Sequence, residues 1–307
     1  VMERDIRNAL AKVPAVKSVN VKWGSSVPVD SRIIGQLALS VKNTVAVASG
    51  KGGVGKSTVA VNVAVALAQS GASVGLLDAD IYGPNDNIML GARGMPSPIQ
   101  VNGATKMVPA FAHGVKLMSM GFLVKPEQAL VWRGPMLHSA LRQFLSDVEW
   151  GDLDYLVVDL PPGTGDVQLS LAQSVPLTGG VIVTMPQEVS QADALRGLNM
   201  FRQMEVPVFG VIENMSYLAM PDGSHMDLFG RGGGKALAAK TGVPFIGEIP
   251  IDPLVRVGGD SGTPIVVSHP DSAAAKALVM IAQDIAAKIS VQTLSKNQKL
   301  IQIEMIE

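Results

Sequence analysis

From Thr44 onward, the hydrophobic positions alternate between two patterns along the chain. Short apolar runs of strand length are separated by longer stretches with the apolar spacing of an amphipathic helix. Nearly continuous apolar runs are typical of parallel strands buried on both faces, so the alternation predicts an α/β fold with a mostly parallel sheet covered by helices on both faces. The expected strands are 45–48, 74–77, 155–158, 180–183, 208–212 and 245–249, and the expected helices are 58–69, 136–144, 191–204, 234–240 and 273–289.

The start of the chain follows a different pattern. Residues 3–13 have helical spacing and residues 16–21 alternate like a strand, so we expect 1–23 to be the end of a small α/β module. The opening at Val1 suggests that the natural start lies upstream. Residues 24–43 begin with a polar, turn-rich segment and are expected to form a linker.

The main domain is therefore expected to span residues 44–289. Within it, segment 98–123 is irregular and is expected to insert a hairpin. The tail, residues 290–307, closes with the alternating stretch 301–305, which predicts either an extra strand or a partner-binding arm.

A glycine-rich segment lies between the first expected strand and the first expected helix. Residues 50–57 match the phosphate-binding pattern G-x-x-x-x-G-K-[ST] in the strand–loop–helix context that the pattern requires. Backbone N–H groups of such a loop, together with the positive end of the following helix, bind phosphate oxygens. We therefore expect ATP to be bound by Gly50, Lys51, Gly52, Gly53, Val54, Gly55, Lys56, Ser57 and Thr58.

Two residues of this loop have distinct expected roles. Lys56 is expected to reach the β- and γ-phosphates, and Ser57 is expected to give its hydroxyl oxygen to Mg²⁺. The alternative interpretation is a glycine-rich turn that binds nothing.

Another expected strand, 155–158, is followed directly by Asp159. An apolar strand that ends in Asp is the Walker B pattern, whose carboxylate holds magnesium, often through water. The next residues, 160–166, contain stiff prolines followed by flexible glycines. This composition suits a conformational switch in which the Gly163 amide senses the γ-phosphate. Pro250 closes a later strand, and we expect its loop to pack near the nucleotide base.

Composition limits the partners and the chemistry. The chain has 25 Lys plus Arg against 26 Asp plus Glu, a net charge of −1, which argues against nucleic acid or a membrane surface as the main partner. It contains 0 cysteines, so disulfides, thiolate metal sites and cysteine nucleophiles are excluded. No apolar run reaches the roughly 18 residues of a membrane-spanning helix. The charged N-terminus lacks a signal-peptide core, so a cytoplasmic location is expected.

A second lysine in the phosphate-binding segment points to a particular group of ATPases. Residues 51–57 resemble the K-G-G-x-G-K-[ST] motif of the deviant Walker A ATPases, which include MinD, ParA, ArsA and the nitrogenase iron protein. The resemblance implies an ATP-bound homodimer in which Lys51 contacts the partner's nucleotide and acts in catalysis with Lys56. A cation there would stabilise charge on the transferring phosphoryl group. The alternative is a solvated loop lysine.

The same resemblance assigns roles to three residues at strand ends. Asp80 is implied to orient or deprotonate the attacking water, and Asp78 is implied to support the magnesium held by Ser57 and Asp159. Asn214 is implied to read the adenine edge, because its amide offers both a donor and an acceptor. An Asp that caps a helix and an Asn in a turn are the alternative interpretations.

More of the chain, residues 45–288, resembles the Mrp/ApbC/Nbp35 family of iron–sulfur cluster carriers. Residues 1–23 resemble the end of the MIP18-like domain that precedes the ATPase in many bacterial members. The family resemblance implies a nucleotide-switched homodimer whose partners are iron–sulfur scaffold or client proteins. Trp132 and Arg133 receive no role, and core packing and a surface ion pair are expected for them. The motifs that carry the resemblance are 79–85, 118–122, 131–135, 159–166, 213–217 and 258–262.

The sequence departs from that family at the cluster ligands. Many members carry a Cys-x-x-Cys pair after the Asn-Met-Ser stretch, and here the corresponding positions are Met220 and Gly223. Thioether and glycine cannot replace two thiolates as iron–sulfur ligands, so no cluster ligand is expected in this chain. An exposed Pro-Asp-Gly turn is the favoured interpretation. The alternative is a mixed metal site offered by Asp222, His225, Met226 and Asp227.

Two other functions stay open. A MinD- or ParA-like positioning switch would use the ATP dimer as a binding surface, but residues 300–307 contain two glutamates and no basic residue, unlike a MinD-type membrane anchor. A ParA-type DNA binder would need a clustered basic surface, which the sequence does not settle. A P-loop kinase would carry arginines in a lid, where segment 91–133 offers only Arg93 and Arg133.

Overall fold

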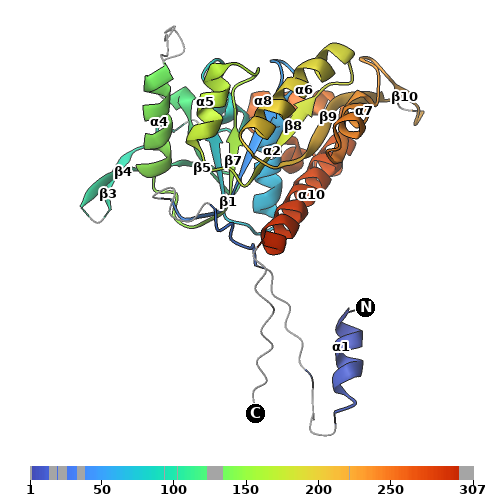
Figure 1. The fold of residues 1–307 in the computed structure, drawn as a ribbon, viewed down its shortest axis with the longest axis horizontal. Coiled ribbons are helices and arrows are strands. Elements are labelled where there is room, and N and C mark those ends of the chain that lie inside the picture. The colour runs from blue at the N-terminus through green and yellow to red at the C-terminus, as the bar shows by residue number, and fades with distance from the viewer. Residues whose placement is uncertain are drawn as a thin grey trace.

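A mostly parallel sheet with helices on both faces forms the centre of the protein (Figure 1). The computed structural model describes residues 2–13, 19, 26–32, 39–92, 94–101, 103–122, 134–220 and 222–296. Within these residues the central sheet has nine strands in the order β10-β9-β8-β1-β7-β2-β6-β5, and β11 pairs with β9. All of its neighbouring strands run parallel except for the pairs β5–β6 and β9–β10.

The nine strands match the expected apolar runs and add to them. Their bounds are β1 (Val41–Ser49), β2 (Val74–Asp78), β5 (Ala110–Ala112), β6 (Val115–Ser119), β7 (Leu153–Asp159), β8 (Gly179–Thr184), β9 (Val208–Ala219), β10 (His225–Met226) and β11 (Phe245–Ile251). A separate hairpin is formed by β3 (Pro98–Val101) and β4 (Ala104–Met107).

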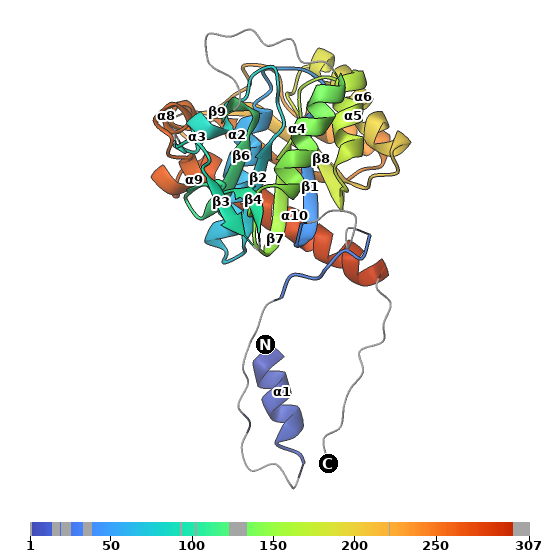
Figure 2. The ribbon, with the colours of Figure 1, turned by 90° about the vertical axis from the view of Figure 1, so that its left-hand side faces the viewer.

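Helices cover the two faces of the sheet, as the view in Figure 2 shows. On one face α2 (Lys56–Gln69) contacts β1, β2, β6 and β7 and packs against α10 (Ala273–Lys296), beside α3 (Asp86–Met89), α8 (Pro253–Ser261) and α9 (Ile265–Ser268). On the other face α6 (Glu188–Gln203) contacts β1, β8 and β9 and packs against α7 (Gly233–Thr241), while α4 (Gly134–Ser146) packs against α5 (Asp166–Ser174). A 3₁₀ turn, Met120–Phe122, follows β6, and α1 (Met2–Leu10) lies apart from the sheet (Figure 1).

Burial in the hydrophobic core explains why the apolar pattern of the sequence predicted these strands and helices. Ala46, Val47 and Ala48 of β1 are fully buried, as expected for a central parallel strand covered on both faces. All six strands and all five helices expected in the main domain are present, and the largest differences are at the ends of β9 and α10, which extend to Ala219 and Lys296. The predicted α/β class and the parallel sheet are therefore confirmed.

Several elements of the main domain were not expected from the sequence, namely β5, β6, β10, α3, α5, α8 and α9. Strand β6 was missed because Lys116 interrupts its apolar run, although segment 98–123 also contains the expected hairpin, β3–β4. Helices α3 and α5 were missed as well. Helix α8 was missed because two glycines lower its helix propensity. Its capping signal is nevertheless clear, since Asp252 accepts a hydrogen bond from the Leu254 N–H (2.9 Å) and Pro253 occupies the first turn.

The expected linker is ordered where the structure describes it. The Asp30 N–H donates to the Lys42 carbonyl (3.0 Å), and the Arg32 guanidinium bonds both carboxylate oxygens of Asp30 and the Thr178 carbonyl (2.9 Å). The Asn43 side chain donates to the Pro28 carbonyl (2.9 Å). Strand β1 begins at Val41, inside the stretch expected to be linker. The segment before β1 is thus held against the starts of β1 and β8.

The remaining expectations concern the two ends of the chain. Helix α10 continues to Lys296, beyond the expected end at Ile289, and Thr293 in this extension is buried. The stretch 301–305 lies outside the described residues, as do most of 14–25, so the proposed module and arm stay predictions. Among the described helices, none combines the length and the apolar character needed to cross a membrane.

Candidate functional site

The phosphate-binding segment forms the turn between β1 and α2. Gly53 and Gly55 have φ values of +79° and +84°, a backbone region that favours glycine. Gly50 packs so closely on α6 that a Cβ at this position would lie 2.0 Å from the backbone of Asp193. The glycines allow a tight turn whose backbone leads directly into α2. The N–H groups at the N-terminus of a helix attract anions.

The lysine and the serine at the start of α2 converge on the carboxylate that ends β7. The Lys56 Nζ lies 2.6 Å from the Asp159 Oδ2 and 3.3 Å from the Asp80 Oδ2. The Ser57 hydroxyl donates to the same Asp159 oxygen (2.6 Å). Burial by itself lowers the pKa of Lys56, but the carboxylates of Asp159 and Asp80 outweigh this effect and the net pKa is raised. Lys56 is therefore a buried cation that lies directly on the Walker B carboxylate.

Strand register explains why the carboxylates meet. Strands β2 and β7 are neighbours, and Asp78 is paired directly with Asp159 in their ladder. Asp78 accepts hydrogen bonds from the Ser119 hydroxyl (2.7 Å) and the Asp80 N–H (3.1 Å). Asp80 in turn accepts from the backbone N–H groups of residues 82 and 83. The carboxyl ends of these parallel strands thus form one edge of the site, as an open sheet predicts.

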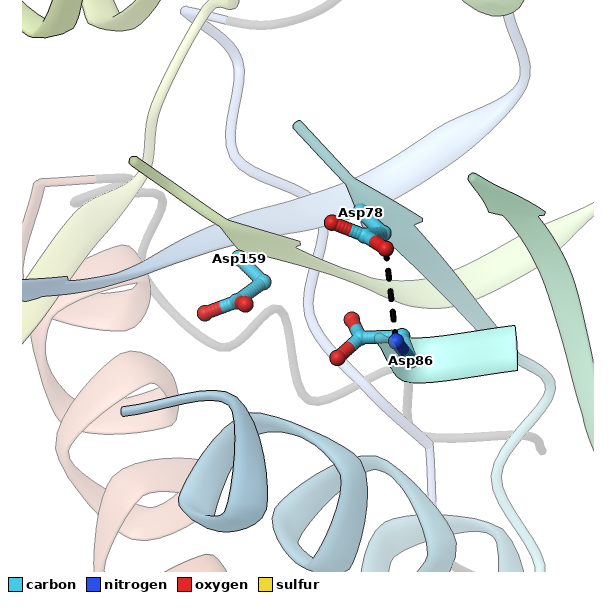
Figure 3. Close-up of side chains that lie close together, drawn as sticks. All are labelled: Asp78, Asp86 and Asp159. Carbon is cyan, nitrogen blue, oxygen red and sulfur yellow. Dashed lines mark hydrogen bonds between the residues drawn. The ribbon is translucent and has the colours of Figure 1, made fainter. Parts of the chain in front are cut away.

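A further buried carboxylate, Asp86, was not expected from the sequence. It lies at the start of α3, and its backbone N–H donates to the Asp78 Oδ2 (3.3 Å). Figure 3 shows its side chain directed toward the space between Asp78 and Asp159. Ligand oxygens of these three residues lie within 4.8 Å of one another. In the sequence, Asp86 stands in an Asn-Asp-Asn stretch that looks like a turn, and no periodic pattern marks so short a helix.

Burial sets the protonation of this cluster. It raises the pKa of Asp78 to about 7, with the nearby Asp159 charge adding to the effect and the Ser119 hydrogen bond opposing it. Burial also raises the pKa of Asp86 well above its usual value, helped by the charges of Asp78 and Asp159. For Asp159 burial raises the pKa, while Lys56 and Ser57 oppose the shift.

Two adjoining cavities lie over the phosphate-binding segment. The smaller, about 210 Å³, is lined by loop residues 51–53 and 55–58 together with Asp80 and Pro162. The larger, about 510 Å³, is lined by Asn214, Pro250, Met215, Val255 and Arg256. Thr58, Asn85 and Met89 line both cavities. The arrangement has the dimensions and polarity of a phosphate pocket that continues into a mostly apolar base pocket.

The other expected site residues lie around these cavities. Lys51 is partly exposed at the smaller one. The Gly163 amide donates to the Ser49 carbonyl (3.1 Å), so it does not point freely into the site. Asn214 lines the larger cavity and also donates to the Val54 carbonyl (2.8 Å). A Cβ on Gly55 would lie 2.1 Å from the Asn214 amide, so that asparagine also braces the phosphate-binding segment, a role not expected from the sequence.

The position expected for cluster ligands is a turn in a hairpin. The Gly223 N–H donates to the Met220 carbonyl (2.9 Å), and Gly223 has φ +83°. His225 stacks on Tyr217 with ring centroids 4.0 Å apart. Among the described residues, the only candidate metal group of three or more is the one formed by Asp78, Asp86 and Asp159. The geometry therefore favours the turn over a mixed metal site at this hairpin. Trp132 and Arg133 lie outside the described residues.

Comparisons with known sequences point to one family. The profile of the ParA family described as NUBPL iron-transfer P-loop NTPase matches residues 40–286. An iron-sulfur cluster carrier protein of Synechocystis is 54% identical over 298 residues, which cover 94% of this chain and 83% of the relative. An iron-sulfur cluster carrier protein of Escherichia coli K12 is 45% identical over 282 residues, covering 91% and 76%. An Arabidopsis thaliana iron-sulfur protein required for NADH dehydrogenase, mitochondrial, is 51% identical over 247 residues, covering 80% and 78%.

Solved structures share the same architecture. A nucleotide-binding protein from Archaeoglobus fulgidus in complex with ADP is 38% identical, with a TM-score of 0.64, covering 73% of this chain and 87% of that one. The Pyrococcus furiosus cell division ATPase MinD is 23% identical, with a TM-score of 0.59, covering 80% and 98%. The second likeness shows a shared fold alone.

The carboxylate cluster leads to a prediction about stability. A carboxyl whose pKa is raised on folding binds a proton that the unfolded chain has lost, so stability falls as pH rises from about 4 to the raised pKa, about 7 for Asp78. Asp86→Asn removes one such group. In a chelating buffer without nucleotide, we expect its melting temperature at pH 8 to exceed that of the wild type by about 2–4 °C, with a shallower decline between pH 5 and pH 8.

The measurement is a thermal melt followed by circular dichroism across that pH range. Asp152→Asn is the matched control, because Asp152 is exposed on the surface. Equal pH dependence for wild type and Asp86→Asn would show that Asp86 carries no unfavourable charge in the folded protein.

Proposed function

This chain belongs to the NUBPL iron-transfer P-loop NTPase family, and from that membership we propose that it is a magnesium-dependent ATPase working as a nucleotide-switched homodimer in iron–sulfur cluster assembly. The reaction is the attack of water on the γ-phosphorus of ATP, which breaks the bond to the bridging oxygen and releases ADP and phosphate. One observation carries the proposal: Lys56 and Ser57 converge on Asp159 at the N-terminus of α2, beside a cavity lined by the phosphate-binding segment.

The donor set fits ATP and magnesium. The Ser57 hydroxyl and Asp159 carboxylate are hard oxygen ligands, and the Asp159 Oδ1 is buried without a hydrogen-bond partner. We propose that these two residues hold Mg²⁺, with Asp78 in support. The ion would neutralise charge on the β- and γ-phosphate oxygens. The backbone of 50–58 would bind the phosphates, and Lys56 would leave Asp159 to reach them.

Catalysis is proposed to depend on Asp80 and Lys51. Asp80 lies at the phosphate cavity and would orient the attacking water or accept its proton. Lys51 is partly exposed at the same cavity, so it would be available to the nucleotide of a second subunit, where an ammonium stabilises charge that develops on the phosphoryl oxygens. Closure of two subunits over the nucleotides would then be required for turnover.

The base and the switch complete the proposed site. Asn214 and Pro250 line the larger cavity, where adenine would lie, and the Asn214 amide would bind the base edge while it braces the loop. The Gly163 N–H would exchange its bond to the Ser49 carbonyl for one to the γ-phosphate. Loss of that phosphate would restore the first bond and move the switch.

The iron–sulfur role is proposed to be indirect in this chain. With 0 cysteines the protein has no thiolate to ligate a cluster, so the nucleotide cycle would act on a cluster held by a scaffold or client protein. The MinD likeness reaches only the fold, and it does not favour a positioning function.

Nucleotide binding is tested by Lys56→Ala. We expect calorimetry with magnesium present to detect ATP binding by the wild type and at least about a tenfold weaker affinity in the variant, because the loss of an ionic hydrogen bond costs about 1.5–3 kcal/mol. Lys235→Ala, at an exposed lysine of α7, should bind like the wild type. Unchanged affinity in Lys56→Ala, with folding confirmed by circular dichroism, would contradict the proposed phosphate contact.

The role of Lys51 in trans predicts a separation of binding from turnover. Lys51→Ala should largely retain ATP binding while its steady-state ATPase rate falls by about 10³-fold, the lower end of the effect of an arginine finger. Mixing this variant with an Asp80→Asn variant should restore part of the activity if each subunit supplies its lysine to the other. A Lys51→Ala rate equal to that of the wild type would refute the contact across the dimer.

Cluster binding by the chain itself is tested by anaerobic reconstitution with iron and sulfide. After desalting we expect no stoichiometric iron and no charge-transfer absorbance, because cluster ligation needs thiolates that this chain lacks. A stable cluster at one equivalent or more per dimer would overturn the indirect role.

A further inference from the structure

Asp86 has no role in the proposed mechanism, yet it is one of the most unusual groups in the site. Its side chain is fully buried, and neither carboxylate oxygen has a hydrogen-bond partner. A buried carboxylate without a partner is costly, so its surroundings require an explanation. Its backbone N–H bond to Asp78 positions the residue but leaves both side-chain oxygens available.

Asp159 also has a buried oxygen without a hydrogen-bond partner. This oxygen is Oδ1, while the Oδ2 accepts from Lys56 and Ser57. Figure 3 shows Asp86 directed into the gap between Asp159 and Asp78, on three different elements of the fold. One oxygen of Asp86 and one of Asp159 lie within 4.8 Å of each other. Each residue also has at least one buried oxygen without a hydrogen-bond partner, an observation that is independent of the hydrogen bonds that hold the cluster together.

The spacing of these oxygens matches a hard metal ion. One oxygen from each of Asp78, Asp86 and Asp159 lies within 4.8 Å of the other two. Opposite oxygen ligands of magnesium or calcium are about 4–5 Å apart, because the metal–oxygen distances are about 2.0–2.6 Å. Carboxylates are the ligands that such ions prefer. The set therefore needs no sulfur or nitrogen donor.

We propose that Asp78, Asp86 and Asp159 form a divalent-cation site that fills without nucleotide. This site differs from the proposed site of the ATP-bound magnesium, because it needs no phosphate oxygen as a ligand. Lys56 can stay on the Asp159 Oδ2 while the ion takes the Oδ1. The ion would be held at the start of α3, and two of its three ligand residues, Asp78 and Asp159, are also proposed to serve the ATP-bound magnesium.

The proposed cation would balance the negative charge of the buried carboxylates. Four carboxylates, those of Asp78, Asp80, Asp86 and Asp159, gather around the ammonium of Lys56. When Lys56 moves to phosphates, Asp159 loses its positive partner. A resident cation on Asp86 and Asp78 would compensate the remaining negative charge. Neither the nucleotide-free nor the nucleotide-bound protein would then hold a group of buried carboxylates without a positive partner. Only this last consequence rests on the proposed ATPase function.

The test is equilibrium binding of Mn²⁺ to the full chain, freed of nucleotide and metals, at pH 7.5. Free Mn²⁺ is read by its electron paramagnetic resonance signal, so the readout does not involve ATPase activity. We expect the wild type to bind one equivalent and Asp86→Asn to bind at least tenfold more weakly. Asparagine keeps the size of the side chain and the backbone bond to Asp78 but removes the charge. The control Asp152→Asn should bind like the wild type.

A second measurement separates metal binding from folding. Mn²⁺ and Mg²⁺ should each raise the melting temperature of the nucleotide-free wild type and should leave that of Asp86→Asn unchanged. Wild-type protein that takes up no Mn²⁺ would overturn the site and would mean that protons neutralise the cluster. Equal binding by wild type and Asp86→Asn would also overturn it. Because ATP is absent throughout, a negative result here leaves ATP binding, measured separately, untouched, and a failure of ATP binding leaves this result interpretable.

Discussion

The ion pair between Lys56 and Asp159 is the interaction on which the site depends. It joins the first helix after β1 to the end of β7, and the Ser57 hydroxyl shares the same carboxylate oxygen. A buried ion pair contributes little net stability, but the removal of one partner leaves an uncompensated charge. The apolar sheet provides the stability that allows so many charged groups at one edge. The start of α2 is therefore held to β7 by a contact that, in the proposed mechanism, ATP would replace.

The sequence predicted the frame of this site because parallel strands carry a clear signal. The apolar runs in the sequence predicted strands β1, β2 and β7. The family resemblance implied that Asp78 supports a magnesium held by Asp159, and the structure pairs these two residues across β2 and β7. Asp86 was beyond such reasoning, since it lies on a helix of four residues with no periodicity. The hydrogen bond from Asn214 to the Val54 carbonyl was also invisible, because it joins residues that only the tertiary fold brings together.

The hairpin after β9 shows how the fold can be kept while a cluster ligand set is absent. Tyr217 and His225 stack, and the Arg231 guanidinium lies 4.7 Å from the centre of the tyrosine ring and 2.8 Å from Glu248. The hydrogen bond from Arg231 is the main reason that the pKa of Glu248 lies below its usual value. Aromatic, cationic and anionic side chains thus stabilise the strand connection through contacts among themselves. Over the residues that the structure describes, the hairpin is therefore held by its own side-chain contacts, without a metal ligand set.

The anchoring of residues 28–32 fixes where the chain enters the ATPase domain. Asp30 and Arg32 hold this segment to Thr178 and to the start of β1, at the opposite end of the strands from the phosphate-binding segment. Figure 1 shows the end of α10 leaving the body on the same side. Residues 28–32 and the end of α10 therefore lie at the edge of the sheet opposite the phosphate-binding segment. A fluorescent label attached to residues 28–32 or to the end of α10 would therefore sit at the far edge of the sheet and leave the phosphate-binding segment uncovered.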